Sequence, residues 1–501
     1  MLKELKNTTK HSFVYALGNI ATKFIGIILI PLYTNINYFS HDEFGILAVL
    51  EASSQIIIGL LSMSMVQNLT RWYWDSKYTN QQKSIFFSSI AFLLATIIPI
   101  GTILSVFADR FSILLFQSSE YKFILQLTII SSCVQIVNNQ IFCLAKLQSR
   151  SGLYSFVQIT KLLITLIFTL LGILHFHLGL KAIWLSVLLG EFLTLLVLMP
   201  YLIKNSSFKI HFNVLKEMLA YGSPLMLAAI SSVILATTDR YMLNSMSGLE
   251  RTGVYSLGFR IANTLKVVIT TSLTLAFSPL MMQYINKPNN QRFYSKTNTY
   301  TAFIFIVTLI GLSLFSLEII KVFTKSKTYW EANYIIPIIA YSLFWGLLKD
   351  NILIGLIITK KTKMIGILIF ITSLINICFN VILIPKFDIY GASVATLVSQ
   401  IFFFISVTFF SQKSYPIKYE WGKIATLLVM SLVIILIGIS IQDINTTIRL
   451  IIKIILFAIF PFLLYLFNFY EKVEIENIKS IFYNWKNPKK LKENLKRLIK
   501  G

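Results

Sequence analysis

Charged side chains lie inside or at the edges of the long apolar stretches of this sequence. An ion at the centre of a bilayer costs about 3 kcal/mol on insertion scales, so residues of this kind are usually retained for a function. Arginine and lysine in such a setting could hold a phosphate or carboxylate, and acidic side chains could bind a proton or a metal cation. The residues concerned are Lys23, Glu51, Lys161, Glu191, Asp239, Arg240, Arg260, Lys266, Lys349 and Asp350.

The elements that must position these charges are membrane-spanning helices. The chain of 501 residues is 56% hydrophobic and only 13% charged, whereas soluble domains carry roughly 25% charged residues. A spanning helix needs about 20 mostly apolar residues. We therefore predict an all-α polytopic membrane protein with about fourteen transmembrane helices, each near that length. The spans cover approximately residues 13–35, 44–66, 84–108, 122–145, 153–175, 179–203, 215–238, 253–278, 299–323, 330–358, 364–385, 389–411, 421–441 and 448–470.

The distribution of basic residues predicts the orientation of these spans. Lysine and arginine concentrate in the N-terminal tail, in alternate loops and in the C-terminal tail. By the positive-inside rule both termini are predicted to be cytoplasmic. Arg449 and the cluster of Lys321, Lys325 and Lys327 fall in the predicted outer loops, and the cluster departs from the rule. The rule explains the net charge of +24, so we expect no nucleic-acid partner.

A weak internal repeat divides the chain. Matching positions, spaced by a nearly constant offset, predict that spans 1–6 and spans 7–12 are two copies in the same orientation. Parallel repeats of this kind are typical of transporters whose binding site lies between the halves. The matched pairs are Tyr15 with Tyr221, Gly45 with Gly253, and Ala182 with Ala392.

The repeat and the termini give the predicted domain organisation. Residues 471–501 place apolar side chains at helical spacing among lysines, which is typical of a segment lying on an anionic inner leaflet, although the part after Pro488 could equally be a solvated tail. The predicted parts are a cytoplasmic N-terminal tail (1–12), an N-lobe (13–203), a C-lobe (215–411), two extra helices (421–470) and a basic amphipathic cytoplasmic tail (471–501).

Six of the charged residues fall on the first and second spans of the two predicted copies. If the lobes face each other, these helices line one central space, in which four positive charges outnumber two negative ones. An unpaired buried ion is costly, so the surplus favours a water-filled cavity that receives an anion. The six are Lys23, Glu51, Asp239, Arg240, Arg260 and Lys266.

Other interpretations of these charges remain open. Arg260 or Lys266 could extend towards a membrane interface, and the Asp239–Arg240 pair could contact lipid headgroups. Glu51 could neutralise Lys23 or Arg260, or it could titrate as a coupling group.

The remaining four charges balance to zero. Lys161 and Glu191 are predicted to pair with each other as a structural contact. Lys349 and Asp350 are adjacent on one helix, so we expect their side chains to point in different directions. Asp350 is a further candidate for binding sodium or a proton.

The motifs of an enzyme are missing from the sequence. It contains no phosphate-binding glycine loop, no HExxH and no metal-ligand spacing of cysteines. The short loops argue against a glycosyltransferase or polymerase, which would usually need a long outer loop. We predict a transport protein that is not an enzyme and has no cofactor beyond a sodium or proton gradient.

Several short motifs resemble bacterial polysaccharide flippases of the Wzx type. This family belongs to the multidrug/oligosaccharidyl-lipid/polysaccharide (MOP) exporter superfamily, and the resemblance extends over the whole chain. The motifs are Tyr15 to Gly26 with Ile30-Pro31-Leu32-Tyr33-Thr34, Tyr221-Gly222-Ser223-Pro224, Thr238-Asp239-Arg240-Tyr241, Gly253-Val254-Tyr255-Ser256, and Gly391-Ala392-Ser393-Val394-Ala395-Thr396.

The resemblance implies two lobes around a central cationic cavity and a specific cargo. An undecaprenyl-diphosphate-linked oligosaccharide would pass from the inner to the outer leaflet of the cytoplasmic membrane by alternating access, to supply a surface polysaccharide such as O-antigen or capsule. Residues 421–470 would lie near the lipid tail, and the polysaccharide polymerase machinery is a possible partner. The diphosphate would be held by Lys23, Arg240 and Arg260, with Lys266 nearby, and Glu51, Asp239 or Asp350 would serve in coupling. The alternative is a cation-coupled multidrug exporter of the same superfamily.

Overall fold

The computed structural model describes residues 26, 28–285 and 287–476. Lys23, the predicted N-terminal tail and most of the predicted C-terminal tail lie outside the described residues. The described chain is helical throughout and contains no β-strand. The first half comprises α2 (Ile30–Tyr33), α3 (His41–Leu61), α4 (Met65–Trp72), η1 (Ser76–Tyr78), α5 (Gln82–Val106), α6 (Ala108–Phe116), α7 (Lys122–Leu147), α8 (Ser151–Leu174) and α9 (Leu180–Lys204).

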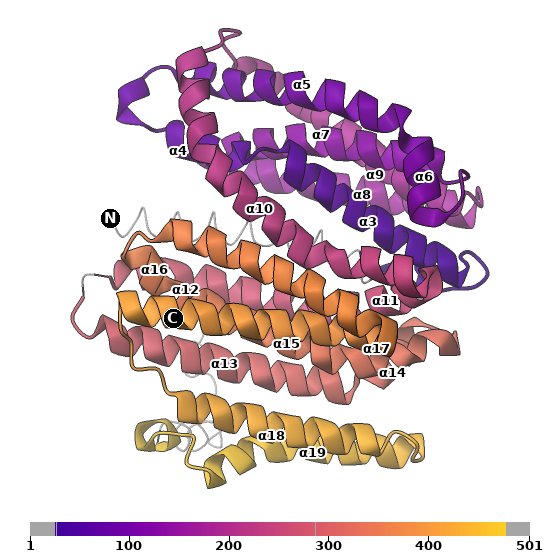
Figure 1. Ribbon diagram of the computed structural model, residues 1–501, viewed down its shortest axis with the longest axis vertical. Coiled ribbons are helices and arrows are strands. Elements are labelled where there is room, and N and C mark those ends of the chain that lie inside the picture. Colours follow the sequence, from indigo (N-terminus) through magenta and orange to yellow (C-terminus); the bar gives the residue numbers. More distant parts are fainter. Residues whose placement is uncertain (1–25, 27, 286, 477–501) are drawn as a thin grey trace, which may run out of the picture.

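The second half begins with a long helix that crosses the molecule. In Figure 1 this helix, α10, runs diagonally from α4 of the first half to α11 of the second. The elements are α10 (Phe212–Ser247), α11 (Leu249–Leu265), η2 (Lys266–Thr270), α12 (Thr271–Gln283), α13 (Asn290–Leu314), α14 (Ser316–Phe323), η3 (Lys327–Glu331), α15 (Ala332–Ile352), α16 (Ile354–Ile358), α17 (Thr362–Ser414), α18 (Trp421–Ser440) and α19 (Thr446–Leu466).

The helices form three groups (Figure 1). Helices α3–α9, here called the N-lobe, gather at the top, and α18–α19 form a separate pair at the bottom. Helices α10–α17, here called the C-lobe, lie between them, except that the first part of α10 reaches up beside α4 and α5. In the N-lobe α7 packs on α9, α3 and α5, and in the C-lobe α17 packs on α10 and α15. The prediction of an all-helical polytopic membrane protein is confirmed.

Eleven described helices are long and apolar enough to cross a membrane. Three departures from the fourteen predicted spans, each of which lowers the count by one, explain the difference. The span at 13–35 lies mostly outside the described residues, and the span at 253–278 is divided among α11, the π-helical η2 and α12. The spans at 364–385 and 389–411 are merged in α17, where Asp388 has a left-handed φ of 52° three residues after Pro385.

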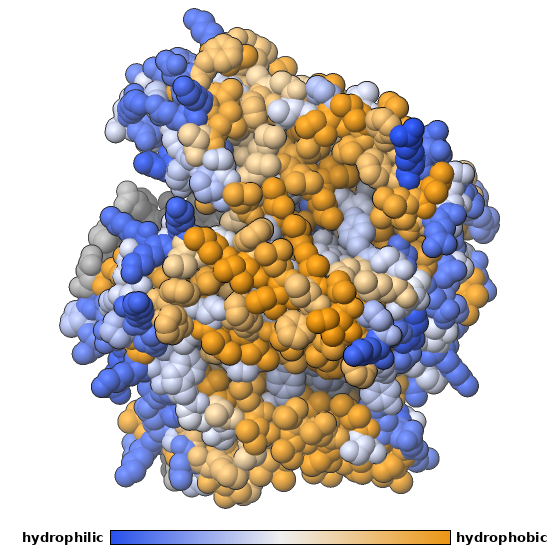
Figure 2. All heavy atoms as spheres, viewed as in Figure 1, coloured by the Kyte–Doolittle hydropathy of each residue, from blue (hydrophilic) through white to orange (hydrophobic). Residues whose placement is uncertain are grey.

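The surface has the distribution of polarity expected of a membrane protein. Figure 2 shows a broad hydrophobic band across the middle of the molecule, with hydrophilic residues gathered at the two ends of the helices. Many large apolar side chains remain exposed on the helices, including Phe156, Phe192, Ile405 and Phe409. In water an exposed apolar surface of this extent would promote association, whereas in a bilayer it faces lipid tails.

Ion clusters attach the α18–α19 pair to the C-lobe. Lys296 of α13 donates to Glu420 and Glu471, which flank the pair at one end. At the other end Glu318 of α14 accepts from Arg449 and Lys453 of α19, and both basic residues are buried. Arg449, counted among the outer-loop residues, lies in the first turn of α19, where Glu318 neutralises its charge.

Candidate functional site

The lobes meet closely at one end, which the charge bias predicts to be the outer end. Local sequence fixes the start of α3 there, because Ser40 and Glu43 form a reciprocal cap in which each side chain accepts from the other's backbone N–H. Gly45 of α3 packs so tightly on Leu249 of α11 that a Cβ at Gly45 would lie 2.7 Å from the Leu249 carbonyl carbon. Gly253, the predicted repeat partner of Gly45, also faces this contact.

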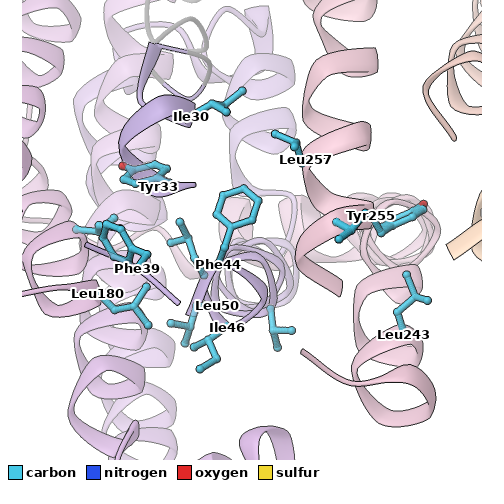
Figure 3. Packing of buried hydrophobic residues seen from close by; sticks show 14 of the residues in the cluster. Ile30, Tyr33, Phe39, Phe44, Ile46, Leu50, Leu180, Leu243, Tyr255 and Leu257 are labelled. Carbon is cyan, nitrogen blue, oxygen red and sulfur yellow. The ribbon is translucent and has the colours of Figure 1, made fainter. Parts of the chain in front are cut away.

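Hydrogen bonds and apolar side chains complete this outer contact. His41 Nε2 lies 2.8 Å from Ser326 Oγ, and the Asn244 amide donates to the Leu115 carbonyl oxygen at 2.6 Å. Figure 3 shows Phe44 of α3 beside Leu257 of α11, within one hydrophobic cluster that contains residues of both lobes. The lobes are therefore held together at this end by close backbone packing at Gly45, by hydrogen bonds and by apolar side chains.

Arg260 of α11 forms one of the ion pairs between the lobes, and Lys77 with Glu217 of α10 forms another near the opposite end of the helices. The Arg260 Nη2 donates to both carboxylate oxygens of Glu51 on α3 at 2.8 Å, and its Nη1 donates to the Gly26 carbonyl oxygen at 3.1 Å. Its guanidinium carbon lies 5.7 Å from the centre of the Phe44 ring. The Arg260 side chain is 15% exposed and that of Glu51 is 43% exposed. Of the two partners considered for Glu51, Lys23 and Arg260, the structure shows Arg260, and this ion pair joins the lobes.

Asp239 occupies a different environment from its neighbour Arg240. Asp239 is buried, and its carboxylate accepts hydrogen bonds from Tyr255 Oη at 2.6 Å, Thr396 Oγ1 at 2.8 Å and Asn380 Nδ2 at 2.9 Å. Figure 3 shows Tyr255 pointing away from the contact between the lobes. The Asn376 side-chain oxygen accepts from Asn380, so several oxygen atoms gather around Asp239 inside the C-lobe. A buried carboxylate with neutral partners suits a site for a proton or a small cation.

Arg240 points elsewhere and has no carboxylate partner among the described residues. Its guanidinium donates to the Ala236 carbonyl oxygen at 3.0 Å and lies 4.6 Å from the centre of the Phe259 ring. Lys266 is exposed at the start of the π-helical segment η2. Of the predicted anion-binding residues, the structure thus describes Arg240, Arg260 and Lys266, while Lys23 lies outside the described residues.

The remaining predicted pairs have separate outcomes. Lys161 and Glu191 form an ion pair, and Asn138 Nδ2 donates to the same carboxylate at 2.8 Å, so that prediction is confirmed. Lys349 and Asp350 were expected to point apart, but Lys349 Nζ lies 2.7 Å from Asp350 Oδ1. The expectation is wrong because the flexible lysine stem can fold back along the helix to reach its neighbour.

Sequence reasoning missed the neutral residues around Asp239. Asn376 and Asn380 stand four residues apart in the predicted span 364–385, which places both amides on one helical face. That spacing was the available signal. Lys453 was also missed, although it interrupts the last apolar span.

The fold and this site define a helical membrane protein whose two lobes close at one end around a shared ion pair. The family of polysaccharide biosynthesis proteins matches residues 8–285, more than half of the chain, and the protein belongs to that family. The MatE family also matches residues 224–382. No curated protein matches the sequence.

Solved structures share this fold at low sequence identity. The lipid II flippase MurJ in an inward closed conformation has a TM-score of 0.67 and 17% identity, covering 93% of this chain and 99% of its own. An inward-facing multidrug resistance MATE family transporter of the MOP superfamily has a TM-score of 0.62 and 14% identity, covering 83% and 95%. The chain therefore has the fold of the MOP superfamily. These solved structures are a lipid flippase and a multidrug transporter, so the fold is one that other membrane transport proteins share.

Proposed function

We propose that this protein moves an undecaprenyl-diphosphate-linked oligosaccharide from the inner to the outer leaflet of the cytoplasmic membrane. The observation that carries the proposal is Arg260, a guanidinium placed between the lobes and held by a carboxylate that is itself 43% exposed. A diphosphate carries more negative charge than Glu51 and matches the forked donors of arginine. The family of polysaccharide biosynthesis proteins supports a glycan as the rest of the cargo.

The contacts of Arg260 support an exchange of anions as the trigger of transport. In the absence of substrate, Glu51 satisfies Arg260 and joins the lobes. An arriving diphosphate takes the place of Glu51, and Arg240 and Lys266 supply further positive charge along the same helices. Release of Glu51 removes a contact between the lobes, so they can rock apart at the outer end while the prenyl tail remains in lipid.

The Asp239 cluster supports coupling to a cation gradient. Its carboxylate lies between α10, α11 and α17 without a basic partner in hydrogen-bonding distance among the described residues. We propose that sodium or a proton binds there and alters the packing of these helices. Asp350 is a weaker candidate because Lys349 already neutralises it, and Glu51 acts in substrate exchange.

The predicted orientation and partners complete the proposal. Both termini face the cytoplasm, and the segment 471–501 lies on the inner leaflet. The N-lobe spans 13–203 and the C-lobe 215–411, and the α18–α19 pair lies beside the C-lobe, where the lipid tail would pass. The polysaccharide polymerase machinery receives the exported lipid.

The test is charge reversal in cells that lack the native gene. Arg260→Glu and Lys23→Glu should abolish surface glycan and accumulate lipid-linked oligosaccharide in the inner leaflet at normal protein levels. The matched control is Arg110→Glu, since Arg110 is exposed on α6, lies over the Phe107 ring and forms no ion pair with a described residue. Normal glycan export in both charge-reversed variants would exclude this cavity assignment.

A cation-coupled multidrug exporter is the second candidate, because MatE matches residues 224–382. Such a protein would extrude cationic dyes from loaded cells under a sodium or proton gradient. Arg240 and Arg260 disfavour a cationic substrate by repulsion. Dye efflux that disappears in Asp239→Asn, together with normal glycan export, would favour this candidate over the flippase.

A further inference from the structure

A cavity in the N-lobe with a mixed polar and apolar lining lies outside the contacts described so far. Its volume is about 540 Å³, within the range of small-molecule sites, and it is an open cavity lined by residues of α3, α4, α5, α7 and α8 and of the turn after α3. Lys146, at one edge of this cavity, belongs to a predicted cytoplasmic loop region. The cavity therefore lies towards the end of the bundle opposite the closed outer contact.

The described lining of this cavity is rich in neutral polar groups. Besides Tyr154, six lining residues carry an amide or an aliphatic hydroxyl, Lys146 supplies the single charge, and no lining residue described is acidic. Amides present donors and acceptors side by side, which suits a ligand bearing many hydroxyl groups. The six are Ser62, Gln67, Thr70, Asn139, Gln140 and Gln158.

Several of these polar groups are not used by the fold. Gln140 is fully buried and donates to Ser89 Oγ at 2.9 Å, yet its Oε1 accepts no hydrogen bond from a described residue. An unsatisfied buried acceptor carries a desolvation cost of about 1–3 kcal/mol. The side chains of Gln67, which is exposed, and Asn139, which is half-buried, make no hydrogen bond with a described residue and are free to bind a ligand. A fully buried amide oxygen kept unpaired beside a cavity, as at Gln140, indicates a ligand.

One face of α3 connects this cavity to the ion pair between the lobes. Ile58 and Ser62 line the cavity and follow Glu51 by seven and eleven residues, spacings that place all three on the same helical face. At 1.5 Å per residue the separation along α3 is about 10 to 16 Å. A diphosphate at Arg260 would therefore carry its attached sugars along this face and into the cavity.

We infer that this N-lobe cavity binds the sugars next to the diphosphate of the lipid-linked oligosaccharide and so determines which glycan is accepted. The inference rests on the proposed flippase function and extends it to specificity. Gln67 and Asn139 are specificity residues that hydrogen-bond sugar hydroxyls, and Lys146 favours neutral or acidic sugars over basic ones. The aromatic side chains of Phe142 and Tyr154 supply an apolar wall.

The experiment compares two lipids on the purified full-length protein. The probes are undecaprenyl diphosphate without sugar, and lipid-linked oligosaccharide extracted from host membranes that lack this protein. The variant is Gln67→Leu with Asn139→Leu, which breaks no hydrogen bond with a described residue. Its control is Gln82→Leu, a half-buried amide on α5 outside the cavity. Arg260→Glu tests the diphosphate site separately.

We expect the double variant to lose about tenfold or more in affinity for the oligosaccharide lipid, the size of two lost hydrogen bonds, with unchanged affinity for the bare diphosphate. The Gln82→Leu protein should bind both lipids normally. Unchanged affinity for the oligosaccharide lipid, or an equal loss for both lipids, would overturn this inference while leaving the flippase proposal intact. Binding of neither lipid by the wild-type protein would overturn the flippase proposal and this inference with it.

Discussion

Replacing Gly45 by alanine should force the outer contact between the lobes apart. The added Cβ would lie 2.7 Å from the carbonyl carbon of Leu249 and closer still to its oxygen. Ordinary van der Waals contact begins at 3.4 Å, so α3 and α11 would have to separate by more than half an ångström. The obstacle is backbone, which cannot turn aside as a side chain can.

The expected energetic effect is large enough to change the conformation. Overpacking a close contact costs about 1–3 kcal/mol, and transporter states commonly differ by a few kcal/mol. Gly45→Ala should therefore shift the population from the outward-closed state towards an outward-open one. Gly253→Ala is the matched control, because its Cβ would meet Gly45 N and the His41 oxygen at 3.2 Å and needs a shift of only a few tenths of an ångström.

A thiol cross-link across the outer contact measures the separation. His41→Cys and Ser326→Cys replace side chains whose polar atoms lie 2.8 Å apart, in a background without Cys133, Cys143 and Cys378. A short cross-linker should join the pair in the parent and in Gly253→Ala, and should fail to do so in Gly45→Ala. Equal cross-linking in all three proteins would refute the packing argument.

Three further predictions follow from the buried charges. Asp239→Asn should remove the dependence of transport on the sodium or proton gradient, measured as flux with and without the gradient, while Asp350→Asn should leave that dependence nearly unchanged; the opposite ranking would contradict the coupling assignment. Lys161→Met should destabilise the protein by about 3–5 kcal/mol, because Glu191 is left as an unpaired buried ion, and thermal unfolding in detergent should show recovery when Glu191→Gln is added; no recovery would contradict the pairing. Lys453→Met should lower the unfolding temperature less than Lys161→Met, since Arg449 still pairs with Glu318; an equal loss would show that Arg449 cannot neutralise this carboxylate alone.

The helices could be predicted well because the length of an apolar stretch and the basic residues that flank it can be seen within a short segment of sequence. The paired Lys161 and Glu191 were also predictable, since each is costly to bury alone. The hydrogen-bond partners of Asp239 were not predictable from the sequence. Thr396 and Asn380 follow Asp239 by more than a hundred residues and contact it only because α10 packs on α17.

The contact of Gly45 with Leu249 could not be predicted from the sequence for a related reason. Glycine at a helix interior can mark a close approach, but the partner backbone is set by how two lobes meet. The prediction that Lys349 and Asp350 point apart was wrong for a local reason. Adjacent helix positions face different directions, but the flexible lysine side chain still reaches the neighbouring carboxylate.

The most direct test of the proposed flippase is transbilayer movement in vesicles that contain only this protein and a labelled undecaprenyl-diphosphate-linked oligosaccharide. The account predicts that the wild-type protein moves the label across the bilayer and that Arg260→Glu moves it no faster than protein-free vesicles. Equal rates for the wild-type protein and protein-free vesicles, under either a sodium or a proton gradient, would contradict the account.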